Sequence, residues 1–277
     1  MRPNLKRGLR LACAAGIAAT LAACQDTTRS TQELQGEAQQ LVDRSTLTVQ
    51  DILAYNQNGG EAQRFLRNAK AVLVCPSIFK MGFVIGGSGG GCTLLARGGR
   101  GSWSAPAFYH MGSGSVGAQV GIQDAELVLF ILTQKGLRAI EDSQFKFGGD
   151  ASISIATMSA GMEGATTAAL RADIVAVSKS KGLYAGLSLQ GSILSSNSDY
   201  NRAYYNQPVG AVDIVEAMRV NNPGADPLRS ALMKFDSVAP PSYRPAAGSG
   251  AATDGGQPMQ LAPRGSVQTQ SLAPLHR

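Results

Sequence analysis

The sequence is poor in the residues that most often bind metals. Its 277 residues include four cysteines and two histidines, which leaves little material for a zinc or iron site, so no cofactor is expected. The 33 glycines and 12 prolines follow no G-X-Y period, and this excludes a collagen-like chain. Hydrophobic residues make up 44%, which excludes a wholly disordered chain, and the length suits one large domain or two small ones.

The basic charge of the chain is not spread over its length. The formal net charge is +6 and the isoelectric point is near 9.3. Four positive charges without an acid lie in residues 1–24, and a further net charge of +2 lies in residues 239–277. Residues 25–238 hold 18 basic and 18 acidic side chains. Because the body is neutral, we expect no nucleic-acid partner.

The first 24 residues have the layout of a secretory signal. A basic segment, Arg2 to Arg10, precedes a 13-residue apolar stretch, Leu11 to Ala23, which is too short to cross a hydrocarbon core that needs about 20 residues. Leu21-Ala22-Ala23-Cys24 resembles a bacterial lipobox, in which the peptide is cut before the cysteine and acyl chains such as palmitate are attached to it. We expect residues 1–23 to be removed and Cys24 to be acylated.

The residue after the cysteine bears on the destination of the protein. Gln25 is not the aspartate that retains lipoproteins of Gram-negative envelopes in the inner membrane. We therefore expect an outer-membrane lipoprotein that faces the periplasm or the cell surface, with residues 24–29 as the acylated tether. Export also places the body in an oxidising compartment, where Cys75 and Cys92 either form a disulfide or stay as two buried thiols.

Periodicity in the mature chain predicts helices at both ends and strands in the middle. Apolar residues recur every three or four positions from Ser30 to Tyr55, and 61–69 is a second short helical segment. Ala71 to Cys75 is a buried strand that Pro76 should end. Further helices are expected at 134–142, 200–205, 212–219 and 227–235, and a disordered Pro/Gly-rich tail at 239–277.

Strand signals fill most of residues 71–193. Ala125 to Leu132 is a continuous apolar run, while 153–155 and 183–190 alternate with a period of two. With only one helix among these strands, βαβ units are not expected. The sequence predicts an α+β domain over residues 30–238: a curved antiparallel β-sheet or barrel-like core, with helices from the N- and C-terminal ends packed against it.

Two catalytic motifs occur without the context that they need. Gly86-Gly87-Ser88-Gly89-Gly90 fits the G-x-S-x-G nucleophile pattern, but no acid lies between Ser88 and His110 and the other histidine is at position 276, so a Gly/Ser hairpin or bend is expected. Gly112 to Gly117 fits G-x-G-x-x-G but precedes a strand, whereas a dinucleotide site needs a helix there. We therefore expect no enzymatic activity.

Two groups of basic residues are candidates for contact with anionic lipid. Arg64, Arg67 and Lys70 follow one another at intervals of three on the second helix, and either contact an anionic surface or form a solvated helix face. Lys179 and Lys181 lie two residues apart on a strand, so they share a face and could bind a phosphate.

Three segments, in order, resemble the SYLF domain. They are an opening segment, Ala69 to Pro76 and then Gly82 to Gly87, the tryptophan motif Gly101-Ser102-Trp103-Ser104-Ala105-Pro106, and the closing segment SKSKGLYAGLSLQGS at 178–192. The resemblance covers about residues 65–205. Gln190 stands where that family usually has an acid, and Cys92 where glycine is common.

The resemblance implies a lipid-binding module without catalytic residues. SYLF proteins of eukaryotes bind phosphoinositides, partly through an N-terminal amphipathic segment that would fall within Ser30 to Ala69 here, and some bundle actin. The sequence therefore predicts a non-enzymatic lipoprotein of the bacterial envelope that recognises membrane lipids, of phosphoinositide type or otherwise anionic. The alternative is a structural or interaction protein whose only lipid is its own N-terminal anchor.

Overall fold

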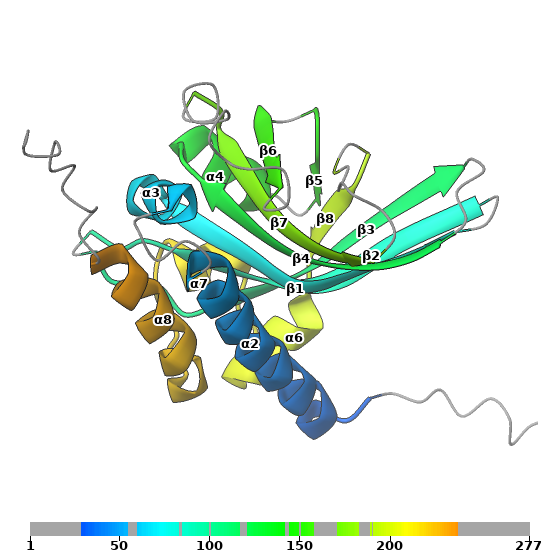
Figure 1. Cartoon of the computed structure of the whole chain (residues 1–277). Helices are drawn as coiled ribbons and strands as arrows, with labels where there is room; N and C mark the ends of the chain where they lie inside the picture. Colours follow the sequence, from blue (N-terminus) through cyan, green and yellow to red (C-terminus); the bar gives the residue numbers. More distant parts are fainter. Residues whose placement is uncertain are drawn as a thin grey trace, which may run out of the picture. The chain divides into compact units, whose positions relative to one another are not determined.

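The molecule is shown as a computed structural model in Figure 1. The structure describes residues 29–54, 60–82, 85–99, 101–116, 121–141, 144–149, 151–157, 171–182, 189 and 191–237. Its helices are α2 (Thr31–Ala54), α3 (Glu61–Asn68), α4 (Gln134–Glu141), α6 (Ser198–Tyr205), α7 (Ala211–Val215), the short 3₁₀ helix η3 (Pro223–Ala225) and α8 (Asp226–Ser237). Its strands are β1 (Ala71–Gly82), β2 (Ile85–Ala96), β3 (Ala107–Val116), β4 (Gly121–Ile131), β5 (Gln144–Lys146), β6 (Ile153–Thr157), β7 (Ile174–Gly182) and β8 (Ile193–Ser196).

The described strands form one curved sheet in the order β5-β8-β3-β2-β1-β4-β7-β6 (Figure 1). Neighbouring strands are antiparallel, with the exception of the parallel pair β6–β7. The predicted fold class is confirmed, and the sheet is mixed because of this pair. Sixteen residues separate Thr157 from Ile174, which is long enough for the crossover that a parallel connection needs.

Helix α2 spans the segment that the periodicity predicts, and it begins with a capping box. The Ser30 amide donates to Glu33 Oε2 over 2.8 Å, and the Glu33 amide donates to Ser30 Oγ over 3.2 Å. The helix packs on β1, β2 and β4 and also contacts α6 and α8, so these helices gather on one face of the sheet (Figure 1). A buried hydrogen bond of 3.0 Å from Thr93 Oγ1 to Ser45 Oγ ties α2 to β2.

Strand β1 does not end at Pro76, contrary to the prediction. The register of β1 against β4 shifts between Cys75 and Ile78, and such an irregularity tolerates a residue that has no amide hydrogen. The irregular stretch brings the Ser77 carbonyl close to β2, where a Cβ at Gly90 would lie only 2.0 Å from its oxygen. Glycine is therefore the residue that lets β2 pass β1 at this point.

A disulfide joins the two central strands of the sheet. Cys75 of β1 and Cys92 of β2 are both fully buried, with their Cα atoms 4.2 Å apart. Of the two alternatives that the sequence leaves open, the structure has the bridge.

The predicted helices at 134–142, 200–205 and 227–235 correspond to α4, α6 and α8, and three expectations differ from the structure. Residues 112–116 of the second glycine motif, which is expected to precede a strand, lie inside β3. The predicted bend at Gly86–Gly90 lies inside β2, and helix α7 stops four residues before the predicted end. Met218 adopts a left-handed φ of 48°, which cannot continue a right-handed helix. Most of the predicted strand at 183–190, the signal and tether up to residue 28, and the tail from residue 238 lie outside the described residues.

Candidate functional site: a glycine trough beside helix α2

On the α2 face of the sheet, strands β2 and β3 present glycine where side chains would normally stand. The register pairs Gly89 with Gly112 and Gly87 with Gly114, and residues that pair in this way point to the same face. Gly91 is next on that face of β2, and a Cβ there would come within 2.9 Å of a leucine side chain of α2. The four paired glycines therefore form a bare floor just beyond α2.

Exposed apolar side chains stand on both sides of this floor. One row of register partners crosses four strands and consists of Phe79, Gly89, Gly112 and Ile193. Each of these residues pairs with the next one in the row. Met81 follows Phe79 on the same face of β1. Phe79 is 45%, Met81 55% and Ile193 39% exposed, although each is a large hydrophobic residue. We call the four-glycine floor and these three walls the glycine trough.

Basic residues occupy both ends of the same row. Lys146 of β5 pairs with Ile193. At the other end Asp124 of β4 pairs with Phe79, and Lys181 of β7 pairs with Asp124. The backbone of Lys181, a candidate predicted from the sequence, thus lies in the row of paired residues that crosses the trough.

The other predicted candidate on β7 is engaged elsewhere. The Lys179 ammonium forms a half-buried ion pair with Asp51 of α2. This pair fixes the C-terminal half of α2 to β7, so Lys179 serves as a contact between elements.

One flank of α2 faces the trough and carries a groove. Residues Glu37, Gln40, Arg44, Leu47 and Asp51 recur every three or four positions and so share this flank. A groove of about 320 Å³ lies between Glu37, Gln40 and Arg44 on this flank and Gly89 to Gly91 of β2. His110 and Tyr200 also line the groove. Because Gly89 belongs to both, the groove continues directly into the trough.

The flank combines cationic and apolar groups at its exposed surface. Arg44 is exposed, and among the described residues we find no hydrogen bond or ion pair for its guanidinium. Leu47, one turn further along, is 65% exposed. A positive charge beside exposed apolar side chains is the pattern of a surface that contacts membrane lipids.

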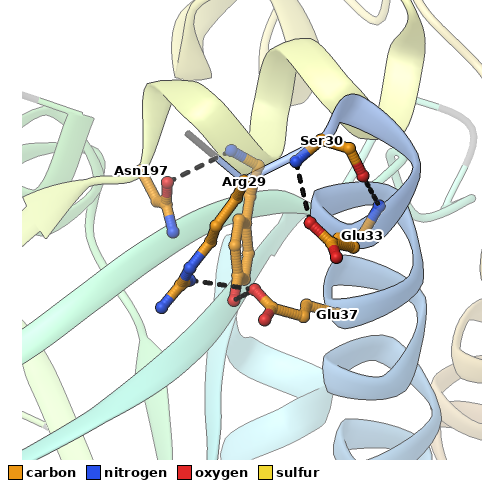
Figure 2. A network of polar contacts seen from close by, with 6 residues as sticks. Arg29, Ser30, Glu33, Glu37 and Asn197 are labelled. Carbon is orange, nitrogen blue, oxygen red and sulfur yellow. Dashed lines mark hydrogen bonds and ion pairs between the residues drawn. The ribbon is translucent and has the colours of Figure 1, made fainter. Parts of the chain in front are cut away.

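A polar network fixes the start of α2 at the groove, as Figure 2 shows. Arg29 Nη1 donates to Glu37 Oε2 over 3.0 Å, and the Tyr200 hydroxyl donates to the same oxygen over 2.8 Å. Asn197 caps α6 by accepting from the Tyr200 amide over 3.1 Å. Burial and the hydrogen bond to Glu37 raise the pKa of Tyr200, so its hydroxyl remains a donor at neutral pH. The network attaches both the first described residue and α6 to the groove wall.

The predicted basic residues near α3 lie far from the trough. Arg64 and Lys70 are exposed and Arg67 is half-buried. Lys70 immediately precedes β1 and lines a second groove of about 350 Å³ together with Arg97 and Glu216. About ten strand residues, or roughly 33 Å, separate this end of β1 from Met81. The structure therefore places the two predicted basic groups at two separate surfaces.

The serine of the G-x-S-x-G pattern lies away from His110, the histidine that the motif would need, and its register partners are Lys80 of β1 and Ser113 of β3. Ser88 Oγ lies 2.7 Å from Ser113 Oγ, its cross-strand partner. Both residues alternate with the trough glycines, so they point to the opposite face from His110. The Ser-His arrangement of a serine hydrolase is therefore not formed by Ser88 and His110.

No group of three or more metal-binding side chains occurs among the described residues. Within the same residues, none of the helices has both the length and the hydropathy to cross a bilayer.

The trough walls are the functional candidates that the sequence alone did not identify. A signal exists: glycines at 87, 89, 91, 112 and 114 alternate as strand positions do, so they fall on one face of each strand. What was missing was the register, because only the pairing places Phe79 and Ile193 in line with these glycines.

Comparison with known proteins gives one family. Residues 112–235 match the family model described as Ysc84, Las17-binding protein actin regulator. The chain is 32% identical over 166 residues to LAS seventeen-binding protein 3 of Saccharomyces cerevisiae, which covers 59% of this chain and 36% of the relative. It is 30% identical over 151 residues to SH3 domain-containing YSC84-like protein 1 of Mus musculus, covering 54% and 44%. The chain thus spans less than half the length of the relatives that it matches.

Proposed function

The chain carries a domain of the Ysc84/SYLF family, and from this premise we propose that it is a non-enzymatic lipid-binding lipoprotein of the bacterial cell envelope. In this proposal Cys24 carries the acyl chains and the domain recognises membrane lipids, anionic ones among them. The family membership agrees with the motifs of the sequence. Lipid binding, the acyl anchor and the location in the cell envelope are what we propose.

The observation that carries the proposal is the exposed apolar surface beside the exposed guanidinium of Arg44. Phe79, Met81 and Leu47 are 45%, 55% and 65% exposed, and the guanidinium of Arg44 lies on the same flank of α2 as Leu47. Large apolar side chains that gather at an exposed surface usually contact a partner or a membrane. An arginine at the border of such a surface suits the phosphate of a lipid headgroup.

The short tether supports a membrane rather than a distant partner. Five residues from Cys24 to Arg29 span at most about 18 Å, and Arg29 is hydrogen-bonded to Glu37 in the groove wall. Acyl chains on Cys24 would therefore keep the groove close to the bilayer surface.

The test is flotation with liposomes of the chain that lacks residues 1–24, so that no acyl chain can attach. All described residues remain in this protein. We expect it to float with vesicles of phosphatidylglycerol and phosphatidylcholine at low salt. Arg44→Gln, which removes the positive charge but keeps a polar, exposed side chain, should weaken binding several-fold. Arg171→Gln, an exposed arginine that precedes β7, serves as the matched control and should bind as the unchanged protein does.

The opposite outcome supports the alternative function. If the protein stays unbound to both anionic and zwitterionic vesicles at low salt, the lipid-binding proposal is wrong. The chain would then be an interaction protein whose only lipid is its anchor. The name of one yeast relative, LAS seventeen-binding protein 3, says that it binds LAS seventeen, so a protein partner is the second candidate for the same exposed surface.

A further inference from the structure

We propose that the glycine trough binds a single lipid acyl chain, with the lipid phosphate at Arg44. The inference rests on the proposed lipid-binding function and specifies its site and its ligand. In this inference the trough binds one lipid molecule, whereas other exposed residues only contact the bilayer surface. The glycines of β2 and β3 then have a direct role in binding.

The floor is open above two of its glycines. A Cβ at Gly114 would meet nothing within 4 Å, and a Cβ at Gly112 would only reach the Ser88 carbonyl oxygen at 4.0 Å. Neither residue has a positive φ. The fold therefore does not demand glycine at these two positions, and the missing side chains leave open space above the sheet.

The walls supply the apolar contact. Phe79 and Ile193 end the same row, three strand spacings or about 14 Å apart along the sheet, with Gly89 and Gly112 between them. Both side chains are more than one third exposed, so an alkyl chain between them would remove apolar surface from water. Met81, a flexible side chain, extends the wall of β1 toward the end of the hairpin.

The groove under α2 supplies a polar end. It meets the trough at Gly89 and is lined by Arg44, which has no ion-pair partner among the described residues. The one carboxylate in its lining, Glu37, already accepts from Arg29 and Tyr200. The arrangement fits an amphiphile, with an anionic group near α2 and an alkyl chain along the glycines.

The shape of the trough argues against protein ligands. An α-helix with its side chains is about 10–12 Å wide, whereas the backbones of the two walls are about 14 Å apart along the sheet and the wall side chains occupy part of that width, so a helix would have little clearance. An added β-strand needs a free sheet edge, but β2 is paired on both sides along the trough, and β3 is paired on both sides from Tyr109 to Gly112. The tether, at most about 18 Å long, also holds this end of the domain near the leaflet that supplies lipid.

The test fills the trough without disturbing the fold. The double variant Gly112→Thr/Gly114→Thr adds β-branched side chains in open space on a strand, so its melting temperature should be unchanged or higher. Its binding of soluble dihexanoyl phosphatidylglycerol, measured by calorimetry on the chain that lacks residues 1–24, should fall at least tenfold. Glycerophosphoglycerol, the same headgroup without acyl chains, should not bind measurably to the unchanged protein.

Two variants complete the design. Gly99→Thr introduces the same side chain at a glycine that also has open space, beyond the opposite end of β2, and should bind lipid normally. Phe79→Asp alters an exposed wall and leaves the floor intact, so it should also lower the affinity at least tenfold if the double variant folds poorly.

Each remaining outcome overturns the inference. If the protein floats with vesicles and the trough variants float and bind soluble lipid equally well, the trough is not the site, although the lipid-binding function stands. If the unchanged protein neither floats nor binds, the proposed function fails and the inference fails with it. If sedimentation shows a dimer that the double variant converts to a monomer, the occupant is a second copy of the chain.

Discussion

At the scale of single residues, Asp173 shows how one carboxylate joins three separate segments. Its Oδ1 accepts from Thr133 Oγ1 over 2.7 Å, and its Oδ2 accepts from the Ser152 hydroxyl over 2.7 Å and from the Ser152 amide over 3.1 Å. These hydrogen bonds, with a smaller contribution from Lys135, lower the pKa of Asp173 to about 2. The charged carboxylate thus stabilises the edge where α4, β6 and β7 begin.

This residue gives a pH-dependent prediction. An unfolded aspartate has a pKa near 3.9, so its stabilisation is complete above about pH 4 and is lost as the pH falls toward 2. Asp173→Asn should lower the free energy of unfolding at pH 7 and flatten the loss of stability between pH 4 and pH 2, as measured by urea unfolding. Asp199→Asn on the exposed surface of α6 is the control. An unchanged acid slope in Asp173→Asn would contradict the assignment.

At the scale of elements, the β1–β2 hairpin carries both the disulfide and one wall of the trough. Cys75 and Cys92 are separated by 17 positions in sequence, and closing a loop of this length restricts the unfolded chain. The bridge lies on the buried central strands, so it holds β1 and β2 in the register that places Phe79 beside Gly89.

Removal of this bridge should have a measurable cost. The double variant Cys75→Ala/Cys92→Ala should lose about 3 kcal/mol of stability in urea unfolding, by the loop-closure argument. In the chain that lacks residues 1–24 these are the only cysteines, so thiol titration of the unfolded, unreduced protein should find none. A count of two free thiols would show that the bridge is absent.

The elements also show what the sequence can and cannot predict. Helix α2 and strand β4 were correctly predicted because each carries a long, regular apolar pattern that local physics determines. The extension of β1 beyond Pro76 was missed because a sheet can absorb a proline at an irregularity, which depends on the neighbouring strand. The trough was missed for the same reason: cross-strand register sets its rows, and register is a long-range property.

At the scale of the whole molecule, the net positive charge and the neutral folded body belong to different parts of the chain. The body between residues 25 and 238 is neutral, so no general field draws the protein to an anionic surface. Membrane attachment then depends on the proposed acylation, and recognition depends on local groups such as Arg44. More than one acyl chain is needed for durable anchoring, since each buried methylene contributes about 0.8 kcal/mol.

The anchor is tested by fatty-acid labelling in a Gram-negative host. The unchanged protein should incorporate labelled palmitate and sediment with the outer membrane, whereas Cys24→Ala should do neither, because it lacks the thiol that the lipobox presents. Cys13→Ala is the matched control, since it also removes a cysteine from the first 24 residues but lies in the part that processing should remove. Recovery of the unchanged mature protein in the soluble periplasmic fraction would contradict the anchor. In that case the exposed face of Phe79, Met81 and Ile193 would have to find its lipid without a tether, and the binding constant of the unanchored domain would alone determine how much of it is on the membrane.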